Sequence, residues 1–132
     1  MLFARLLLGL GIASQAAGAI AAPSFEERVQ RARTAEESPA LKPYFTAMGK
    51  MVEPNLRSGV VNCLAKFKDP DLAAFVVVAD AGKDGEPTKI DVRPHTNVSD
   101  CFAKSFEFAR LPKLAPHTKD PTLPIFFQIN LK

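Results

Sequence analysis

The stretch Leu72–Arg93, LAAFVVVADAGKDGEPTKIDVR, decides the fold. Its first part, 72–79, is rich in branched and aromatic residues, apolar on both faces and too short for a stand-alone helix, which predicts a buried strand. Asp84-Gly85 is a hairpin turn signal. The residues after it, 88–93, alternate between polar and apolar, as in a strand with one face on the core. We therefore expect two antiparallel strands joined by a tight turn.

The segment after this hairpin predicts a helix and a last strand. Asn97 is a favourable helix cap, and apolar residues then recur at i, i+3, i+4, i+7, i+8 and i+11 up to Ala109. This makes 97–109 the best amphipathic helix of the sequence. Four prolines indicate that 111–124 is an extended connection. Residues 125–131 alternate again and predict the closing strand.

The segment before the hairpin is helical in pattern. Ser24 and Glu27 match a capping box, so we expect a short polar helix at Phe25–Thr34. Residues 41–67 place apolar side chains at helical spacing, but Pro54 lacks the amide hydrogen that a helix interior needs. The sequence therefore predicts either two helices here or one helix bent at that proline.

Together these elements predict an α+β fold. Two or three helices precede a small three-stranded antiparallel sheet of ββαβ order, which packs against helices. We expect 22–39 to form a short polar helix with a linker and 40–132 to form a single domain, because a chain of this length suits one core.

The amino terminus, 1–21, has the pattern of a cleavable signal peptide. A single basic residue, Arg5, precedes the apolar run 6–12, and Ala19-Ile20-Ala21 supplies small residues at the positions that signal peptidase reads. We predict cleavage after Ala21, with cleavage after Ala22 as the alternative. The interrupted apolar run does not suit a spanning helix, so we expect a periplasmic or secreted protein with no stable membrane anchor after processing.

Two cysteines, Cys63 and Cys101, are the only ones in the chain, and each lies on the apolar face of a predicted helix. In an oxidising compartment two such cysteines most simply pair. Their disulfide would close a loop that stabilises the fold by up to about 4 kcal/mol. A redox couple would need reactive thiols at closer spacing.

The order of elements and the cysteine positions resemble the TonB carboxy-terminal superfamily, in particular AgmX/PglI-type domains with a cysteine pair. The resemblance covers about Cys63–Leu131 and rests on the strand 75–78, the turn 82–85, the second strand 90–92, the helix start 97–101 and the strand 125–129. It implies the fold. The sequence has neither the membrane helix and proline-rich spacer of the energy transducers nor their tyrosine-proline pair, so the resemblance does not extend to energy coupling.

The charged residues argue against several functions and point to none. The formal net charge is +3, and the basic residues are scattered without an aromatic platform, which argues against nucleic-acid binding. The acidic residues around the hairpin fit an exposed turn better than a calcium site or an acid/base pair; they are Asp80, Asp84, Glu86 and Asp91.

The nucleophiles and metal ligands form no motif either. His95 and His117 are the only histidines, too few for a metal site. Ser99 and Ser105 lack a neighbouring base. We therefore predict no catalytic residues, no metal and no cofactor. A concave pocket that gathered His95, Asp91 and Ser99 would instead favour an envelope enzyme.

The function predicted from these features is a non-enzymatic periplasmic binding or adaptor domain with a protein partner, acting as a monomer or homodimer. The last strand is the candidate binding edge, since an exposed edge can accept a partner's strand; its residues are Ile125, Phe126, Phe127, Gln128, Ile129 and Asn130. By phase, Phe108 and Phe126 lie off the main apolar faces. The alternative is an inhibitor or immunity protein that neutralises an envelope-targeting toxin or hydrolase.

Overall fold

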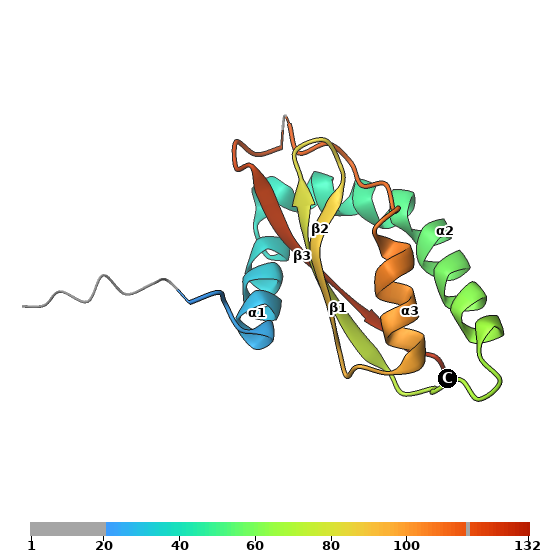
Figure 1. Cartoon of the computed structure of the whole chain (residues 1–132). Coiled ribbons are helices and arrows are strands. Elements are labelled where there is room, and N and C mark those ends of the chain that lie inside the picture. Colours follow the sequence, from blue (N-terminus) through green and yellow to red (C-terminus); the bar gives the residue numbers. More distant parts are fainter. Residues whose placement is uncertain (1–20, 116) are drawn as a thin grey trace, which may run out of the picture.

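Strands β1 (Phe75–Gly82) and β2 (Pro87–Arg93) form the predicted antiparallel hairpin. They belong to a computed structural model that describes residues 21–115 and 117–132 (Figure 1). The predicted leader, 1–21, lies outside the described residues except for Ala21, and so does Pro116 of the predicted connection.

β1 begins at Phe75, which corrects the predicted strand 72–79. The loop before β1 is held by a later segment rather than by a neighbouring strand. The Asn97 side chain accepts a hydrogen bond from the amide of Asp71 at 3.0 Å and donates one to the carbonyl of Asp69 at 3.1 Å. Residues 72–74 therefore leave the sheet.

The third strand, β3 (Thr122–Ile129), starts three residues earlier and ends two residues earlier than the predicted 125–131. It pairs antiparallel with β1 along its whole length, from Phe75 opposite Ile129 to Gly82 opposite Thr122. The strand order is β2-β1-β3, so β3 lies at an edge. Pro124 fits inside this strand because an edge strand needs ladder hydrogen bonds on one side only.

A β-bulge interrupts the hairpin. Val78 pairs with Asp91 and Asp80 pairs with Thr88, so two residues of β2 lie opposite Ala79. One of them, Lys89, has a φ of 50°, the left-handed region that non-glycine residues rarely adopt. The bulge turns part of the β2 backbone out of the ladder.

Helix α3 (Asn97–Phe106) begins with a cap that the sequence placed one residue too late. The hydroxyl of Thr96 accepts from the amide of Ser99 at 3.0 Å, and the Ser99 hydroxyl accepts from the amide of Thr96 at 2.7 Å. Thr96, not Asn97, is therefore the N-cap. The helix also ends before the predicted Ala109, which is still buried in the turn that follows.

Helix α2 (Lys42–Lys66) is one helix with Pro54 in its interior, which settles the two alternatives that the sequence left open. Figure 1 shows it change direction near its middle. Its buried side carries Tyr44, Met48, Val52 and Cys63. In the part of the chain that the structure describes, no helix is long and apolar enough to span a membrane.

The main core lies between the sheet and the layer of α2 and α3. Four aromatic rings form its centre: Phe102 contacts Phe75 and Phe106, and Phe106 contacts Phe127, with ring centroids 5.5 to 5.9 Å apart. These rings come from β1, α3 and β3, so the core joins the hairpin, the amphipathic helix and the last strand as predicted from their apolar faces.

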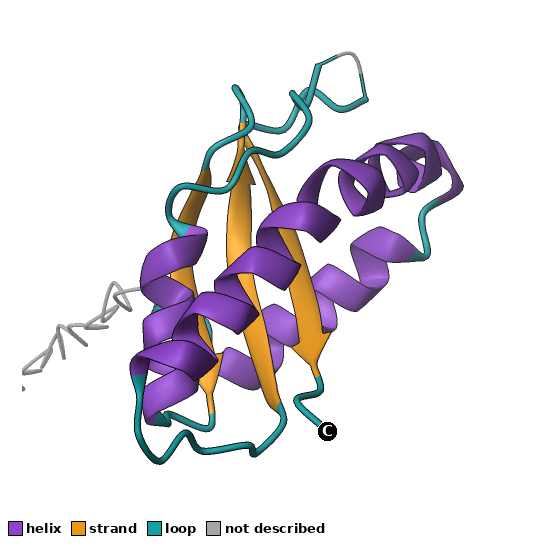
Figure 2. Cartoon of the chain, turned by 90° about the vertical axis from the view of Figure 1, so that its right-hand side faces the viewer, coloured by secondary structure: helices purple, strands orange, loops and turns teal. Residues whose placement is uncertain are grey.

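Helix α1 (Phe25–Glu36) covers the opposite face of the sheet, so that helices lie on both faces (Figures 1 and 2). It is two residues longer than the predicted 25–34 and is followed by a short 3-10 turn, η1 (Pro39–Leu41). Val29 and Ala32 are its buried residues. At its two ends, cation-π contacts join Phe25 to Arg93 of β2 and Arg33 to Phe126 of β3.

The predicted disulfide between Cys63 and Cys101 is present. It joins the last turn of α2 to the second turn of α3, with 5.8 Å between the two Cα atoms. The helices approach closely on the same side, because a Cβ at Gly59 would lie 3.2 Å from the Phe102 ring. The disulfide therefore braces the helical layer.

Candidate functional site

The predicted binding strand lies at a sheet edge, and its side chains fall into two groups. Ile125 and Ile129 are buried in the main core. Phe126 lies on the α1 face, as its phase predicted, and is half-buried with the Arg33 guanidinium 5.4 Å from its ring centre. Gln128 is exposed, and Asn130 is exposed just after the strand ends.

The second half of this edge faces a shallow groove of about 430 Å³, which we call the edge groove. Its strand side consists of Gln128, Ile129 and Asn130, and its helix side comes from the middle of α2, with Glu53, Leu56, Arg57, Val60 and Val61. Val61 is 59% exposed, whereas Leu56 and Val60 are half-buried. The groove thus has an apolar helix wall beside an open strand.

The rim of the edge groove is polar. Glu53 and Arg57 form an exposed ion pair at 2.9 Å on one turn of α2, and Gln128 and Asn130 present amide side chains from the strand side. Because both charges of the ion pair are exposed, the pair contributes little to stability.

The backbone of β3 completes the site. β1 occupies one side of the strand. Within residues 21–115 and 117–132, no other element exchanges backbone hydrogen bonds with β3. An edge strand of this kind offers a row of amide and carbonyl groups to an extended peptide, while the adjacent pocket selects alternate side chains.

The sequence predicted only part of the edge groove. Its strand residues were in the predicted binding edge, but Leu56 and Val60 read as ordinary core positions of a helix. Helical phase identifies the apolar side of α2, and it cannot show which strand that side lies beside. The groove depends on the tertiary placement of α2 next to the end of β3.

A polar cluster elsewhere contains two of the three residues that the enzyme hypothesis named, His95 and Asp91. His95 Nδ1 lies 2.7 Å from a carboxylate oxygen of Asp100. Its Nε2 lies 2.5 Å from a guanidinium nitrogen of Arg93 and 3.7 Å from a carboxylate oxygen of Asp91. Asp91 in turn binds Arg93 at 2.6 Å. The cluster is a surface network of paired charges.

Ser99 does not belong to this cluster. It is fully buried, and its hydroxyl donates to the carbonyl of Pro94 at 2.8 Å while it caps α3. The structure thus brings His95 and Asp91 together and leaves Ser99 in a capping role, out of reach of solvent. Ser99 is therefore arranged as a capping residue and not as an activated nucleophile.

The remaining candidate ligands are dispersed. His117 packs edge-to-face on Tyr44, with ring centroids 5.5 Å apart. Asp80 lies 3.9 Å from Arg28 of α1 rather than with the other hairpin acids. Among the residues that the structure describes, no group of three or more His, Cys, Asp or Glu side chains is arranged to hold a metal ion.

The exposed aromatic residue expected from the helix phase is present. Phe108 is 84% exposed in the turn after α3.

Comparisons of the chain with protein-family models, with curated proteins and with solved structures give no match.

Proposed function

We propose that this chain is an exported, non-enzymatic binding domain that receives an extended segment of a partner protein along the edge groove. The observation that carries the proposal is the open half of β3 beside apolar α2 side chains. Backbone groups of the strand would supply affinity, and the pocket formed by Val60 and Val61 would select an apolar side chain of the partner. This is binding by strand addition.

The features around the groove support the same proposal. A disulfide in a chain without a membrane-spanning helix among its described residues fits an exported protein. The periplasm is the compartment we propose, on the strength of the leader pattern in 1–21. The likeness to TonB carboxy-terminal domains, proposed from the sequence, is compatible with a ββαβ sheet that binds proteins.

A charge placed in the groove tests the proposal. Val61→Lys should abolish capture of the partner from an extract of the organism that makes the protein, because a lysine cannot be desolvated against an apolar side chain. Met51→Lys is the matched control, since Met51 is also exposed on α2 but does not line the groove. Both variants should keep the wild-type melting temperature.

A photoreactive cross-linker at Asn130 then locates the partner. It should join the chain to a single protein, whose cross-linked peptide is extended and apolar at alternate positions. Equal capture by both lysine variants, or retention of small molecules alone, would refute the proposal. If the captured protein is a hydrolase or toxin that loses activity in the complex, the domain acts as an inhibitor; if it keeps its activity, the domain is an adaptor.

A further inference from the structure

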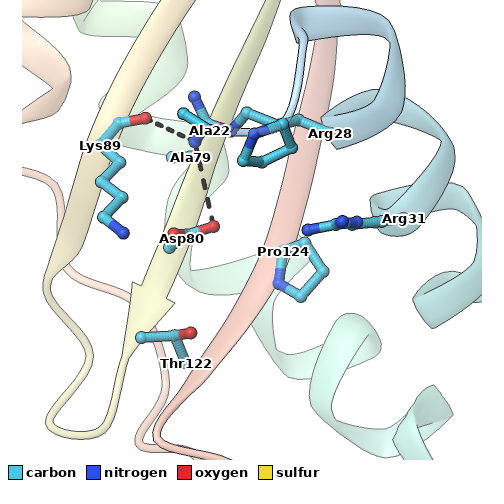
Figure 3. A pocket seen from close by; sticks show the side chains of 9 residues that line it. Ala22, Arg28, Arg31, Ala79, Asp80, Lys89, Thr122 and Pro124 are labelled. Carbon is cyan, nitrogen blue, oxygen red and sulfur yellow. Dashed lines mark hydrogen bonds and ion pairs between the residues drawn. The ribbon is translucent and has the colours of Figure 1, made fainter. Parts of the chain in front are cut away.

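A second site lies on the opposite face of the sheet, under the first half of α1. It is a cavity of about 440 Å³ bounded by α1, the bulge of β2 and the first residues of β3 (Figure 3). We call it the bulge cavity. Ala22 and Pro23, which precede α1, form part of its wall, and Pro124 forms another part. Its volume is within the range of small-molecule sites.

A backbone carbonyl of the bulge holds a cation at this cavity. Arg28, whose side chain is only 16% exposed, reaches from α1 across β1 to the carbonyl of Lys89, with 2.5 Å between donor and acceptor. The same guanidinium nitrogen lies 3.9 Å from a carboxylate oxygen of Asp80. Figure 3 shows both interactions from the side of the cavity. A positive charge is therefore held at a fixed place against the sheet.

The bulge cavity carries an excess of positive charge. Arg28, Arg31 and Lys89 line it, and Asp80 is the one acidic residue in its lining. In the described part of the chain, neither Arg31 nor Lys89 lies within ion-pair distance of a carboxylate. Two cations thus remain without a counter-ion around a cavity of ligand size.

We propose that the bulge cavity binds a small dianion with carboxylate or phosphate oxygens. Arginine guanidinium groups match such oxyanions with two parallel hydrogen bonds, and an ammonium group adds a point charge. The net charge of the lining selects a dianion over a monoanion. Partial exclusion of water by α1 and the proline walls strengthens the attraction relative to an open surface.

Lys89, which lines the bulge cavity, has an unfavourable left-handed backbone conformation. A left-handed backbone at a non-glycine residue costs free energy, and such strain gathers at ligand-binding positions. A glycine at position 89 would adopt the same φ without that cost. The lysine therefore keeps its side chain at the rim of the cavity in spite of a less favourable backbone.

The test is calorimetric titration of the purified protein at low salt with succinate and with inorganic phosphate, and with succinamide as the uncharged comparison. One or both dianions should bind with 1:1 stoichiometry and weaken as salt rises, whereas succinamide should not bind. Arg31→Gln should weaken binding at least about tenfold, as expected for one lost charge-assisted hydrogen bond. The matched control Arg110→Gln, an exposed arginine outside the cavity, should bind like the wild type.

Lys89→Gly is the second variant, because it removes the ammonium group while suiting the backbone. It should fold at least as well as the wild type and bind the dianion at least about tenfold more weakly. The relative affinities for succinate and phosphate identify which oxyanion the cavity prefers.

Three results would overturn the proposal: no saturable binding of either dianion, unchanged affinity in Arg31→Gln, or an equal loss in Arg110→Gln, which would mean diffuse surface attraction. The edge groove lies on the other side of the sheet. Val61→Lys should therefore leave dianion binding unchanged, and a failure of partner capture does not affect this inference.

Discussion

At the scale of single residues, Gly85 allows the hairpin turn for two reasons: its backbone conformation and its close contact with a distant segment. Its φ is 90°, and a Cβ added there would lie 2.1 Å from the carbonyl oxygen of Leu111. The amide of Leu111 donates to the carbonyl of Gly85 at 2.8 Å. The turn is thus fixed by a contact with the distant connection after α3 as well as by its own backbone conformation.

Gly85→Ala should consequently destabilise the protein by about 2 kcal/mol or more, since the clash is with backbone and the left-handed conformation is unfavourable for alanine. Gly49→Ala is the matched control, because Gly49 lies within α2 and its added Cβ would meet no atom within 4 Å. That control should be neutral or stabilise by up to about 1 kcal/mol through helix propensity. Urea denaturation measures both, and equal effects would contradict the contact described.

Tyr44 offers a second prediction at this scale, because it is the chain's one tyrosine and there is no tryptophan. Its hydroxyl donates to the carbonyl of Pro112 at 3.1 Å, and burial raises its pKa to about 12. The folded state therefore holds this proton more tightly than the unfolded state, whose tyrosine pKa is about 10. The resulting stability is complete below pH 10 and is lost as pH rises from 10 towards 12.

Absorbance of tyrosinate reports this titration directly. The native protein should titrate near pH 12, and the same protein in concentrated urea near pH 10. In Tyr44→Phe the free energy of unfolding should fall less steeply above pH 10, and at neutral pH it should be about 1–3 kcal/mol lower than in the wild type because the Pro112 carbonyl loses its donor. A native midpoint near 10 would contradict the burial of this hydroxyl.

At the scale of secondary-structure elements, the disulfide and the helix pair that it joins determine how α2 is held. Among the helices and strands, α2 packs mainly against α3, and its interior proline removes one of its own hydrogen bonds. The covalent link between Cys63 and Cys101 therefore compensates for a helix that is weakened in its middle.

Replacing both cysteines by alanine should lower the free energy of unfolding by about 2–4 kcal/mol, as expected for a bridge that closes a loop of 38 residues. Urea denaturation with and without a reducing agent checks this. The wild type should lose stability on reduction by a similar amount, and the double variant should be insensitive to the reducing agent. Sensitivity of the double variant would mean that the reducing agent acts elsewhere.

The sequence predicted these elements well where a local signal exists. The hairpin, the Ser24 N-cap of α1 and the amphipathic α3 each follow from spacing and turn residues that act within a few positions; of the predicted capping box before α1, only the bond from the Glu27 amide to the Ser24 hydroxyl is formed. The boundaries that were wrong were set by distant partners. β1 starts late because Asn97 holds the preceding loop, and β3 starts early because β1 offers it a partner as far as Gly82.

The two sites could be predicted only in part. The edge strand had a clear alternating pattern, but the α2 wall of the edge groove depends on where a helix from elsewhere in the chain crosses. The bulge cavity had no signal at all, because a lysine at 89 does not mark a left-handed residue as glycine would. Arg28 read as one more solvated charge on a polar helix.

At the scale of the whole molecule, the sheet separates two cores of unequal size. The larger one contains the aromatic rings and the buried side of α2, whereas the α1 side buries few apolar residues, chiefly Val29, Ala32 and Val78. Local opening costs less free energy where less apolar surface is buried. The two sides should therefore open independently.

Amide hydrogen exchange should show this difference. Backbone amides of α1 should exchange faster than those of β1 and α3, at a rate set by detachment of the helix and not by global unfolding. Succinate or phosphate, if bound in the bulge cavity, should slow exchange in α1 and leave α3 unchanged, because binding stabilises only the state in which α1 is docked. Equal protection of α1 and α3 would mean that the two cores unfold as one unit.

The wall of the bulge cavity that Ala22 and Pro23 supply has a consequence for maturation. These residues directly follow the predicted cleavage position, so the position of cleavage would decide which of them remain in the cavity wall. Cleavage after Ala21 leaves both wall residues and places a new α-ammonium group beside the cavity. Cleavage after Ala22 removes one wall residue. The mass of the mature protein therefore reports which form of the cavity the cell makes.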